Sequence, residues 1–436
     1  MRAASVVVFS SVVVLASWTA GCGSDSGTSG SPALAPPEPP ADSGAHVTDG
    51  GAPTGDASAS DARASDAGAA SDSGASDIPA FPQLVSSGGP TLAHPKVVPI
   101  FYPGYTWTTQ VTDWLTKVGA TPYWSAATAE YGVGALVMGT PVHLTEASPA
   151  TIDSQTISTW LAAKLDGTHP EFGVADPETI YAVFFPKTTQ IDGATGSCTS
   201  YGGYHEDLSI GGKAIPYAVV PECPTFGPVA GLDMVTGAGS HELIEAATDP
   251  YPSSNAAYSG LDDASLPLEI FLGGNAENGD LCSLNWDAFF KPTGFDYVVQ
   301  RGWSNAAAKL GKDPCAPINP SDEPYFASAP VMPDTATVLG TQSKAVKIAV
   351  GDTKTIDIKL WSNGPTSKPW TVQVKQPRRV TTPQLELTLD KTTGQNGDTL
   401  KLTIKVLVAG KKNYESFAVE SNIGNQRAYW AGVVVQ

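Results

Sequence analysis

The 436-residue chain is poor in basic residues and in cysteine. It has 25 Lys and Arg against 43 Asp and Glu, a formal net charge of −18, and it has no cluster of Lys and Arg. Proteins that bind nucleic acid carry a basic surface, so nucleic acid is excluded as a partner. No two of the five cysteines have CxxC spacing, which argues against a cysteine zinc site. The N-terminal apolar run, Val6 to Trp18, is shorter than the ~20 residues that a membrane-spanning helix needs.

The first residues have the order of an export signal. Arg2 supplies a positive charge, the apolar run follows, and Thr19-Ala20-Gly21 lead into Cys22. Small residues directly before a cysteine are typical of bacterial lipoprotein signals, so we predict a signal over residues 1–22 with Cys22 as the lipidated N-terminus. The alternative is a plain cleaved signal. Either way the chain is exported, and we expect an outer-membrane or cell-surface lipoprotein, or a secreted protein, that meets a membrane only through its anchor.

Residues 23–84 are predicted to be a disordered tether. From Gly23 to Asp77 the sequence is almost wholly Gly, Ser, Ala, Pro, Asp and Thr without an aromatic residue, and nine acidic residues face only Arg63. Such a segment buries too little apolar surface to offset the entropy lost on ordering. It therefore carries much of the acidity without adding to a folded core.

Four cysteines remain once Cys22 is set aside, and an even number in an exported chain predicts two disulfides. Three pairings are possible. We favour Cys198 with Cys223 and Cys282 with Cys315, because each bridge then closes a modest loop on either side of residues 240–250.

About 350 residues follow the tether, which favours two domains. We predict an α/β domain of zincin-like type over residues 85–316, a proline-rich linker over 317–334 and an all-β domain over 335–436. Apolar runs and helical spacing place the elements of the first domain. We expect its functional site beside an edge strand at 217–220. The predicted strands are 96–102, 179–185 and 217–220, and the predicted helices are 108–118, 154–165 and about 231–248.

The C-terminal hundred residues alternate between apolar and polar side chains, as at 355–360, 385–389 and 400–406. Period-two alternation with Gly-Asp and Asn-Gly turns predicts half-buried antiparallel strands. We therefore expect a β-sandwich of immunoglobulin-like shape, without the cysteine pair of true immunoglobulin domains.

The run SHELIEAATDP, residues 240–250, carries the strongest chemical signal. Side chains four apart on a helix lie on one face, so His241 and Glu245 can ligate one ion. Glu242 lies one residue round the helix, where it can act on an attacking water as general base. The pattern HExxE differs by one residue from the HExxH of zinc proteases.

A catalytic zinc needs a third protein ligand and one open position. We rank Asp280 and Glu277 first for the third ligand, because they lie three apart just before a predicted disulfide, and His205 and Asp249 behind them. Zinc is the expected metal. A set of one imidazole and two carboxylates is also acceptable to calcium or manganese.

Five segments between Gly88 and Cys315 resemble the plant EXORDIUM or phosphate-induced protein family and its bacterial relatives. The resemblance implies a secreted or wall-associated protein, and His241, Glu242, Glu245 and Asp249 then match the family's motif helix. Glu277, Asp280 and Cys282 match its EIGDLC-like segment, with Asn278 in place of the usual apolar residue, and His205 matches the histidine after its cysteine loop. The family has no settled activity, so the resemblance supports the site rather than a reaction. The segments are residues 96–102, 198–205, 240–250, 277–282 and 297–305.

From these residues we predict an exported metal-dependent hydrolase of the peptidase type that acts as a monomer on a peptide or on a cell-wall or other extracellular substrate. The alternative is a non-catalytic surface or matrix protein, in which the same helix holds a structural metal or none.

Overall fold

The computed structural model describes residues 11–12, 80–274, 276–377, 380, 382–410 and 412–436. Cys22, and with it the predicted lipidation, lies outside the described residues. So do all but two residues of the predicted signal and most of the predicted tether. Among the described helices, none is both long and apolar enough to traverse a lipid bilayer.

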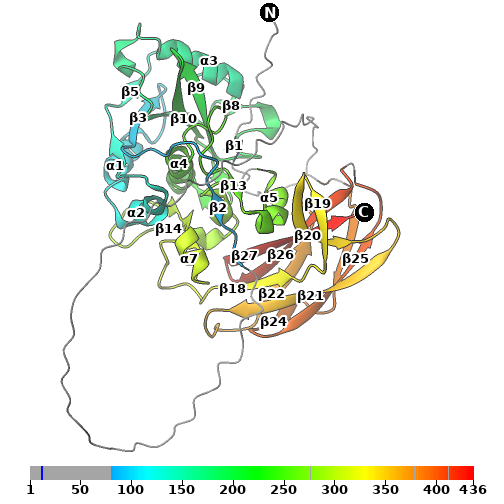
Figure 1. Cartoon of the computed structure of the whole chain (residues 1–436). Helices are drawn as coiled ribbons and strands as arrows, with labels where there is room; N and C mark the ends of the chain where they lie inside the picture. Colours follow the sequence, from blue (N-terminus) through cyan, green and yellow to red (C-terminus); the bar gives the residue numbers. More distant parts are fainter. Residues whose placement is uncertain (1–10, 13–79, 275, 378–379, 381, 411) are drawn as a thin grey trace, which may run out of the picture. The chain divides into compact units, whose positions relative to one another are not determined.

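A mixed sheet forms the framework of the N-terminal region (Figure 1). Its strand order is β1-β9-β10-β7-β3-β4, and β5 also pairs with β3. The strands from β10 to β4 are parallel, whereas β9 runs antiparallel to β10 and the two-residue β1 antiparallel to β9. The bounds are β1 Ser11–Val12, β3 Lys96–Phe101, β4 Val137–Met138, β5 Val142–His143, β7 Thr179–Phe185, β9 Tyr204–Ile210 and β10 Lys213–Pro221.

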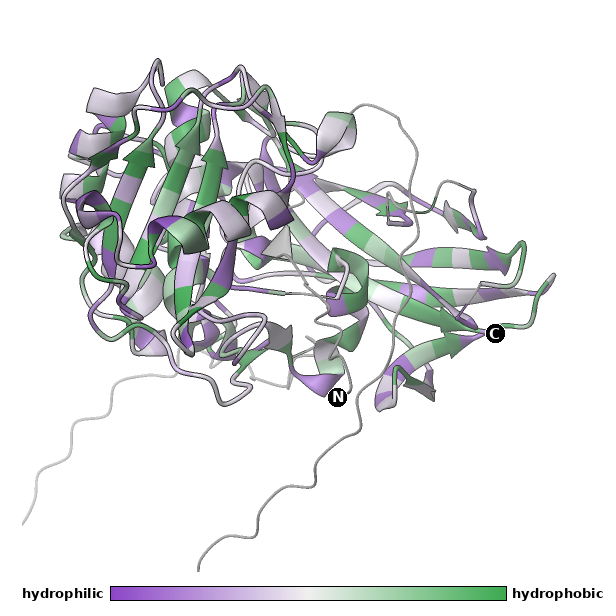
Figure 2. Ribbon diagram, turned by 90° about the horizontal axis from the view of Figure 1, so that it is seen from above, coloured by the Kyte–Doolittle hydropathy of each residue, from purple (hydrophilic) through white to green (hydrophobic). Residues whose placement is uncertain are grey.

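Helices cover both faces of this sheet. Alternate residues of each strand point to opposite sides, so both faces carry apolar side chains that pack against helices. Val97 and Phe101 of β3 pack with three helices on one face, whereas Val98 and Ile100 pack with a single helix on the other. Strand β7, in the middle of the sheet, is buried at every position, as expected for a sheet covered on both faces, and green segments are frequent on the sheet in Figure 2. The first face carries α1 Thr108–Val118, α2 Pro122–Thr128 and α4 Gly231–Thr248, and the second carries α3 Ser154–Lys164.

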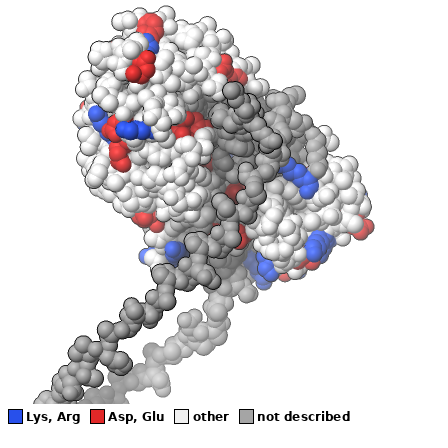
Figure 3. Space-filling view, turned by 45° about the horizontal axis from the view of Figure 1, so that its top comes forward, with Lys and Arg blue, Asp and Glu red and all other residues white. Residues whose placement is uncertain are grey.

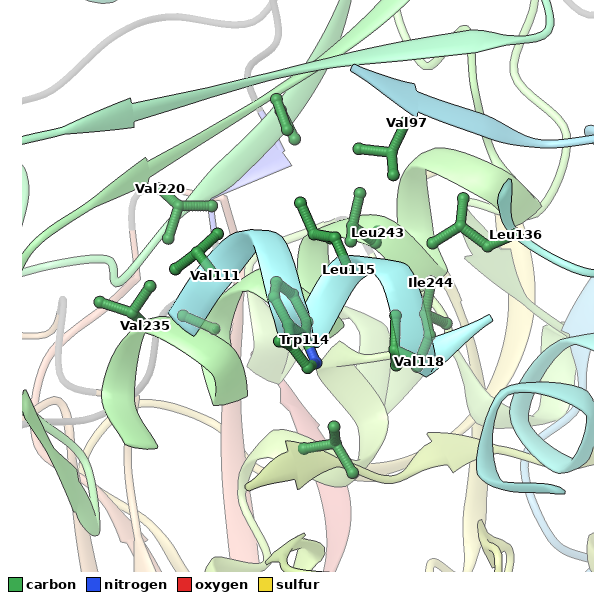
Figure 4. Packing of buried hydrophobic residues seen from close by; sticks show 14 of the residues in the cluster. Val97, Val111, Trp114, Leu115, Val118, Leu136, Val220, Val235, Leu243 and Ile244 are labelled. Carbon is green, nitrogen blue, oxygen red and sulfur yellow. The ribbon is translucent and has the colours of Figure 1, made fainter. Parts of the chain in front are cut away.

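Helix α4 is buried over most of its length, from Met234 to Thr248. Trp114 of α1 packs against it where Gly239 lacks a side chain, since a β-carbon at 239 would lie 2.9 Å from the indole ring. Figure 4 shows Leu243 and Ile244 of α4 among the apolar side chains of α1. Pro250 disfavours further helix at Asp249, where the helix ends. A helix held this tightly gives its polar side chains fixed positions.

The C-terminal region is a β-sandwich of two sheets, as the alternation predicted. One sheet has the order β18-β21-β25-β23 and the other β19-β20-β27-β26-β22-β24. Their apolar residues form one core around Trp370 and Phe417, and alternation of colour is visible along the strands in Figure 2. The bounds are β18 Phe326–Pro330, β19 Asp334–Val338, β20 Thr341–Lys347, β21 Thr353–Ser362, β22 Trp370–Lys375, β23 Leu385–Leu389, β24 Thr393–Gly394, β25 Thr399–Val406, β26 Tyr414–Ile423 and β27 Gln426–Val435.

Three sequence-based boundaries differ from the structure. Strand β18 lies inside the stretch predicted as a linker, so the sandwich begins before residue 335. The predicted tether ends earlier than residue 84, because Phe81 is buried and Leu84 pairs with Leu261 in a short antiparallel ladder. The strand predicted at the edge, now β10, is internal, since β9 pairs along its outer side. β9 was missed because its sequence, YHEDLSI, has too many polar residues to resemble a buried strand.

The remaining elements are short. They are β2 Leu84–Val85, β6 Thr151–Ile152, β8 Gln190–Ile191, β11 Thr225–Phe226, β12 Val229–Ala230, β13 Gly260–Leu261, α5 Leu266–Leu272, α6 Asp280–Ser283, β14 Phe289–Phe290, β15 Val299–Gln300, β16 Gly302–Trp303, α7 Asn305–Lys309 and β17 Cys315–Ala316, with 3-10 turns at 129–131, 170–172, 193–195, 263–265 and 286–288.

Two disulfides join the cysteine pairs that the sequence favoured, Cys198–Cys223 and Cys282–Cys315. They close spans of 25 and 33 residues on either side of α4 and fit an extracellular protein. On the face drawn in Figure 3, charged side chains are scattered in small groups among uncharged residues.

Candidate metal centre

Helix α4 presents His241 and Glu245 on one face, one turn apart. His241 Nε2 lies 3.0 Å from Glu245 Oε2, and both side chains are buried. Glu242 is 0% exposed and lies beside them. Three ionisable groups on five consecutive residues of a buried helix carry a large desolvation cost, so their placement calls for a binding partner.

Strand β9 brings a second imidazole to this helix. Tyr204 faces the α3 side of the sheet, so the next residue, His205, points to the α4 side. His205 Nδ1 lies 3.6 Å from Glu245 Oε2 and 3.7 Å from Glu242 Oε2. His205 and His241 therefore both face the same oxygen of Glu245. Sequence analysis ranked His205 low because it placed this residue in a loop rather than on a strand beside α4.

The facing atoms make no hydrogen bond of good geometry among the described residues, and their contacts are ion pairs with one another. They are His205 Nδ1, His241 Nε2, Glu245 Oε2 and both carboxylate oxygens of Glu242, all buried. A buried polar atom without a partner costs roughly 1–3 kcal/mol, and more when it is charged. Two imidazole nitrogens and one carboxylate are the donor set of several catalytic zinc sites. Side chains of this buried cluster have the spacing to hold a metal ion, in two groups that share Glu245.

Each histidine turns its other ring nitrogen toward an acceptor in the protein. His205 Nε2 lies 3.2 Å from the carbonyl oxygen of Asp249 and 3.5 Å from Glu277 Oε1. His241 Nδ1 lies 2.9 Å from Gln300 Oε1. A carbonyl oxygen only accepts, so Nε2 of His205 carries its proton and Nδ1 is left free for a metal. Partners of this kind orient histidines in metal sites.

The segment before the second disulfide closes over the helix. Asp280 N donates to Glu245 Oε1 at 3.0 Å, which holds this carboxylate with Oε2 toward the two histidines. Asp280 Oδ1 lies 3.7 Å from His241 Nε2, and its side chain is 15% exposed. Gly279 passes directly over His241 and Glu245. Cys282, two residues after Asp280, ties this segment to Cys315.

The charges of the cluster are strongly coupled. Burial by itself disfavours charged imidazole, but Glu245 and the other carboxylates outweigh it and raise the pKa of His241 to about 10. For His205, burial is likewise outweighed by Glu277, Glu242 and Glu245, and its pKa is well above the usual range. Burial raises the pKa of Glu242, and the two histidines hold that of Glu245 down despite burial. Ligands must be deprotonated to bind a metal, so an ion at these nitrogens would compete with protons.

The structure gathers most predicted site residues but gives them different surroundings. Two groups of side chains have metal-binding spacing: His241, Glu242 and Glu245, and His205, Glu245 and Glu277. Burial raises the pKa of Glu277 and of Asp280 well above the usual range, so both carboxyls resist ionisation. One oxygen of the Asp249 carboxylate accepts from Ala257 N at 2.5 Å, and the carbonyl oxygen of Asp249 lies against His205 Nε2.

Two residues near the cluster were not singled out as site residues. Gln300 contacts His241 from β15, and Gly203 leaves room for Glu242, because a β-carbon at 203 would lie 2.8 Å from Glu242 Oε1. Neither residue type signals metal chemistry by itself. Only their positions relative to α4 identify them.

Comparison with known proteins leaves the function open. No family model matches the chain, and no curated protein matches it. Among solved structures, the titin M3 domain matches with 11% identity over 26% of this chain and 95% of its own, and the trigonal form of titin M4 with 8% identity over 26% and 94%, each with a TM-score of 0.16. A three-domain titin structure, an E-to-A variant of I67–I69, matches with 16% identity over 26% and 32%, also with a TM-score of 0.16. The account of the sandwich therefore rests on its own strands.

Proposed function

We propose that the chain is an exported, metal-dependent hydrolase of the peptidase type. The observation that carries the proposal is the convergence of the buried atoms His241 Nε2, His205 Nδ1 and Glu245 Oε2 beside the buried carboxylate of Glu242. The proposal has three further parts. The segments around these residues are similar to the EXORDIUM family, the metal is zinc, and the substrate is a peptide or cell-wall component.

The proposed site residues have three roles: metal ligands, general base and orientation of a ligand. His205, His241 and Glu245 hold the ion, which when bound polarises a substrate carbonyl and acidifies a water. Glu242 takes a proton from the attacking water and passes it to the leaving group. Neither oxygen of Glu242 makes a hydrogen bond of good geometry among the described residues, and its ion pair with His205 is long, at 3.7 Å. Glu277 and the Asp249 carbonyl keep His205 turned toward the ion.

A specific observation favours a second function, a non-catalytic surface protein with a structural ion. His205, His241, Glu242 and Glu245 are each 0% exposed, so a substrate reaches them only if the covering segments move. In this case the ion joins β9 to α4 and stabilises the domain. This function needs the same ligands but gives Glu242 no role in a reaction.

One comparison separates the two functions. Purified protein is expected to hold about one transition-metal ion, and His241→Ala to lose it. Glu242→Gln is expected to keep the ion and to lose hydrolysis of casein or of a peptide library. The matched control is Glu269→Gln, which removes a half-buried carboxylate away from the cluster, where it accepts from Leu261 N.

A metal-free wild type would remove the basis of both functions. A metal-loaded wild type that cleaves no peptide would leave only the structural role. A Glu242→Gln variant that cleaves at the full rate would rule out Glu242 as the base.

A further inference from the structure

Gln300 is a fully buried amide that the proposed reaction does not use, and each of its polar groups has a fixed partner. Its backbone N donates to Ser240 Oγ at 2.8 Å, and its backbone oxygen accepts from Tyr123 OH at 2.6 Å. In its side chain, Nε2 donates to the carbonyl oxygen of Gly279 at 2.8 Å, and Oε1 lies 2.9 Å from His241 Nδ1.

These bonds fix which way the amide faces. The Gly279 carbonyl can only accept a hydrogen bond, so the NH2 group of Gln300 must point to it. Oε1 must then point to His241, and an oxygen acceptor requires that Nδ1 of this histidine carry the proton. The ring is thereby held with Nε2 toward Glu245 and the rest of the cluster.

We propose that Gln300 is a positioning residue of the metal centre, which sets the tautomer of His241 and ties the Gly279 segment over the site. The proposal rests on the proposed metal site, but not on catalysis by it. Gln300 is joined to Ser240, directly before His241, and to Gly279, directly before Asp280. Its side chain alone joins His241 of the motif helix to the segment that holds Glu245, and its backbone adds the bond to Ser240.

The chain offers a matched control. Asn278 is also a fully buried amide of this region: its Nδ2 donates to Ala127 O at 3.0 Å, and its Oδ1 accepts from Trp303 N at 2.8 Å. In the described part of the chain, no hydrogen bond of Asn278 goes to a histidine of the cluster. Asn278→Leu thus removes a comparable buried network, whereas Gln300→Leu also removes the acceptor for His241. Gln300→Glu retains an acceptor oxygen for His241 while losing the donor to Gly279.

The test measures zinc affinity by competition with a chromophoric chelator, on folded full-length protein, for wild type, Gln300→Leu, Gln300→Glu and Asn278→Leu. Loss of a bond that orients a metal-binding histidine costs about 10–100-fold in metal affinity. We expect a loss of this size in Gln300→Leu, a smaller loss in Gln300→Glu and a change below about threefold in Asn278→Leu. Equal affinities in wild type and Gln300→Leu, or equal losses in Gln300→Leu and Asn278→Leu, would overturn the proposal.

A second measurement does not depend on a bound ion. In nitrogen-edited spectra of chelated wild-type protein, the Nδ1–H of His241 should give a slowly exchanging, downfield signal, since its bond to Gln300 persists in either charge state of the ring. The signal should be present in Asn278→Leu and absent in Gln300→Leu. Its presence in a wild type that binds no zinc would reject the metal centre while retaining the bond. Its absence from wild type would reject the bond itself.

Discussion

Gly279 passes so close to His241 that a β-carbon on residue 279 would lie 2.7 Å from the Nδ1 atom of the histidine. The same carbon would lie 2.9 Å from Glu245 Oε1. The backbone of one segment is thus in contact with two candidate ligands, and the absence of a side chain permits it.

Gly279→Ala should therefore disturb the metal centre. Forcing an atom into a packed interior costs about 1–3 kcal/mol, and here either the ligands or the segment must move. We expect lower zinc affinity together with a lower unfolding free energy in urea. Gly260→Ala is the control, because its β-carbon would meet nothing nearer than Glu269 Oε2 at 3.6 Å. A Gly279→Ala variant with wild-type zinc affinity would contradict this close packing.

Gly203→Ala should act on the base rather than on the ligands. Its β-carbon would lie 2.8 Å from Glu242 Cγ and Oε1, so Glu242 must turn away. We expect a wild-type metal content, measured by plasma emission, together with a loss of hydrolysis that approaches that of Glu242→Gln. A variant that keeps full hydrolysis would show that the position of Glu242 is unimportant.

Chelation should lower the stability of the protein. An ion that binds only the folded state adds RT ln(1 + [L]/Kd), about 2.7 kcal/mol at a concentration of 100 Kd. Without the ion, His241 Nε2 and Glu245 Oε2 remain buried with only their ion pair to each other. Dialysis against EDTA should lower the melting temperature, and zinc should restore it in wild type but not in His241→Ala. A melting temperature that EDTA leaves unchanged would argue against a resident ion.

Arg301 should matter for folding and not for metal binding. Its guanidinium is fully buried and pairs with Asp313 at 3.2 Å and with Asp322 at 2.5 Å. Arg301→Met leaves two buried carboxylates without their cation, which costs about 3–5 kcal/mol. Urea unfolding should detect this loss. Lys401→Met, which breaks an exposed pair with Asp357, should cost less than about 1 kcal/mol. Similar losses of unfolding free energy in the two variants would contradict a special role of buried Arg301 in stability.

Local sequence patterns predicted much of the fold. The predicted motif helix agrees with α4 at both ends, and the strand at 179–185 agrees with β7, because each has a strong period or a continuous apolar run. The disulfide pairing followed from loop length and position along the chain. These signals depend on neighbours in the sequence.

Parts of the candidate site depend on long-range packing and were harder to predict from the sequence. His205 was considered, but its polar strand has no clear period, and its orientation toward α4 follows from pairing with β10. Gln300 is 59 residues from His241 along the chain, and only the packing of β15 against α4 brings them together. A glutamine in an apolar strand gives no sign of this contact.

The apolar core that contains Phe81 continues from the α/β region into the sandwich. The ring of Phe81 lies 5.1 Å from that of Trp361 and 5.9 Å from that of Trp430, and Trp303 and Cys282 belong to the same cluster. Neither region can then melt without uncovering aromatic surface of the other. Heat should unfold residues 80–436 in one cooperative transition, with calorimetric and van't Hoff enthalpies that agree.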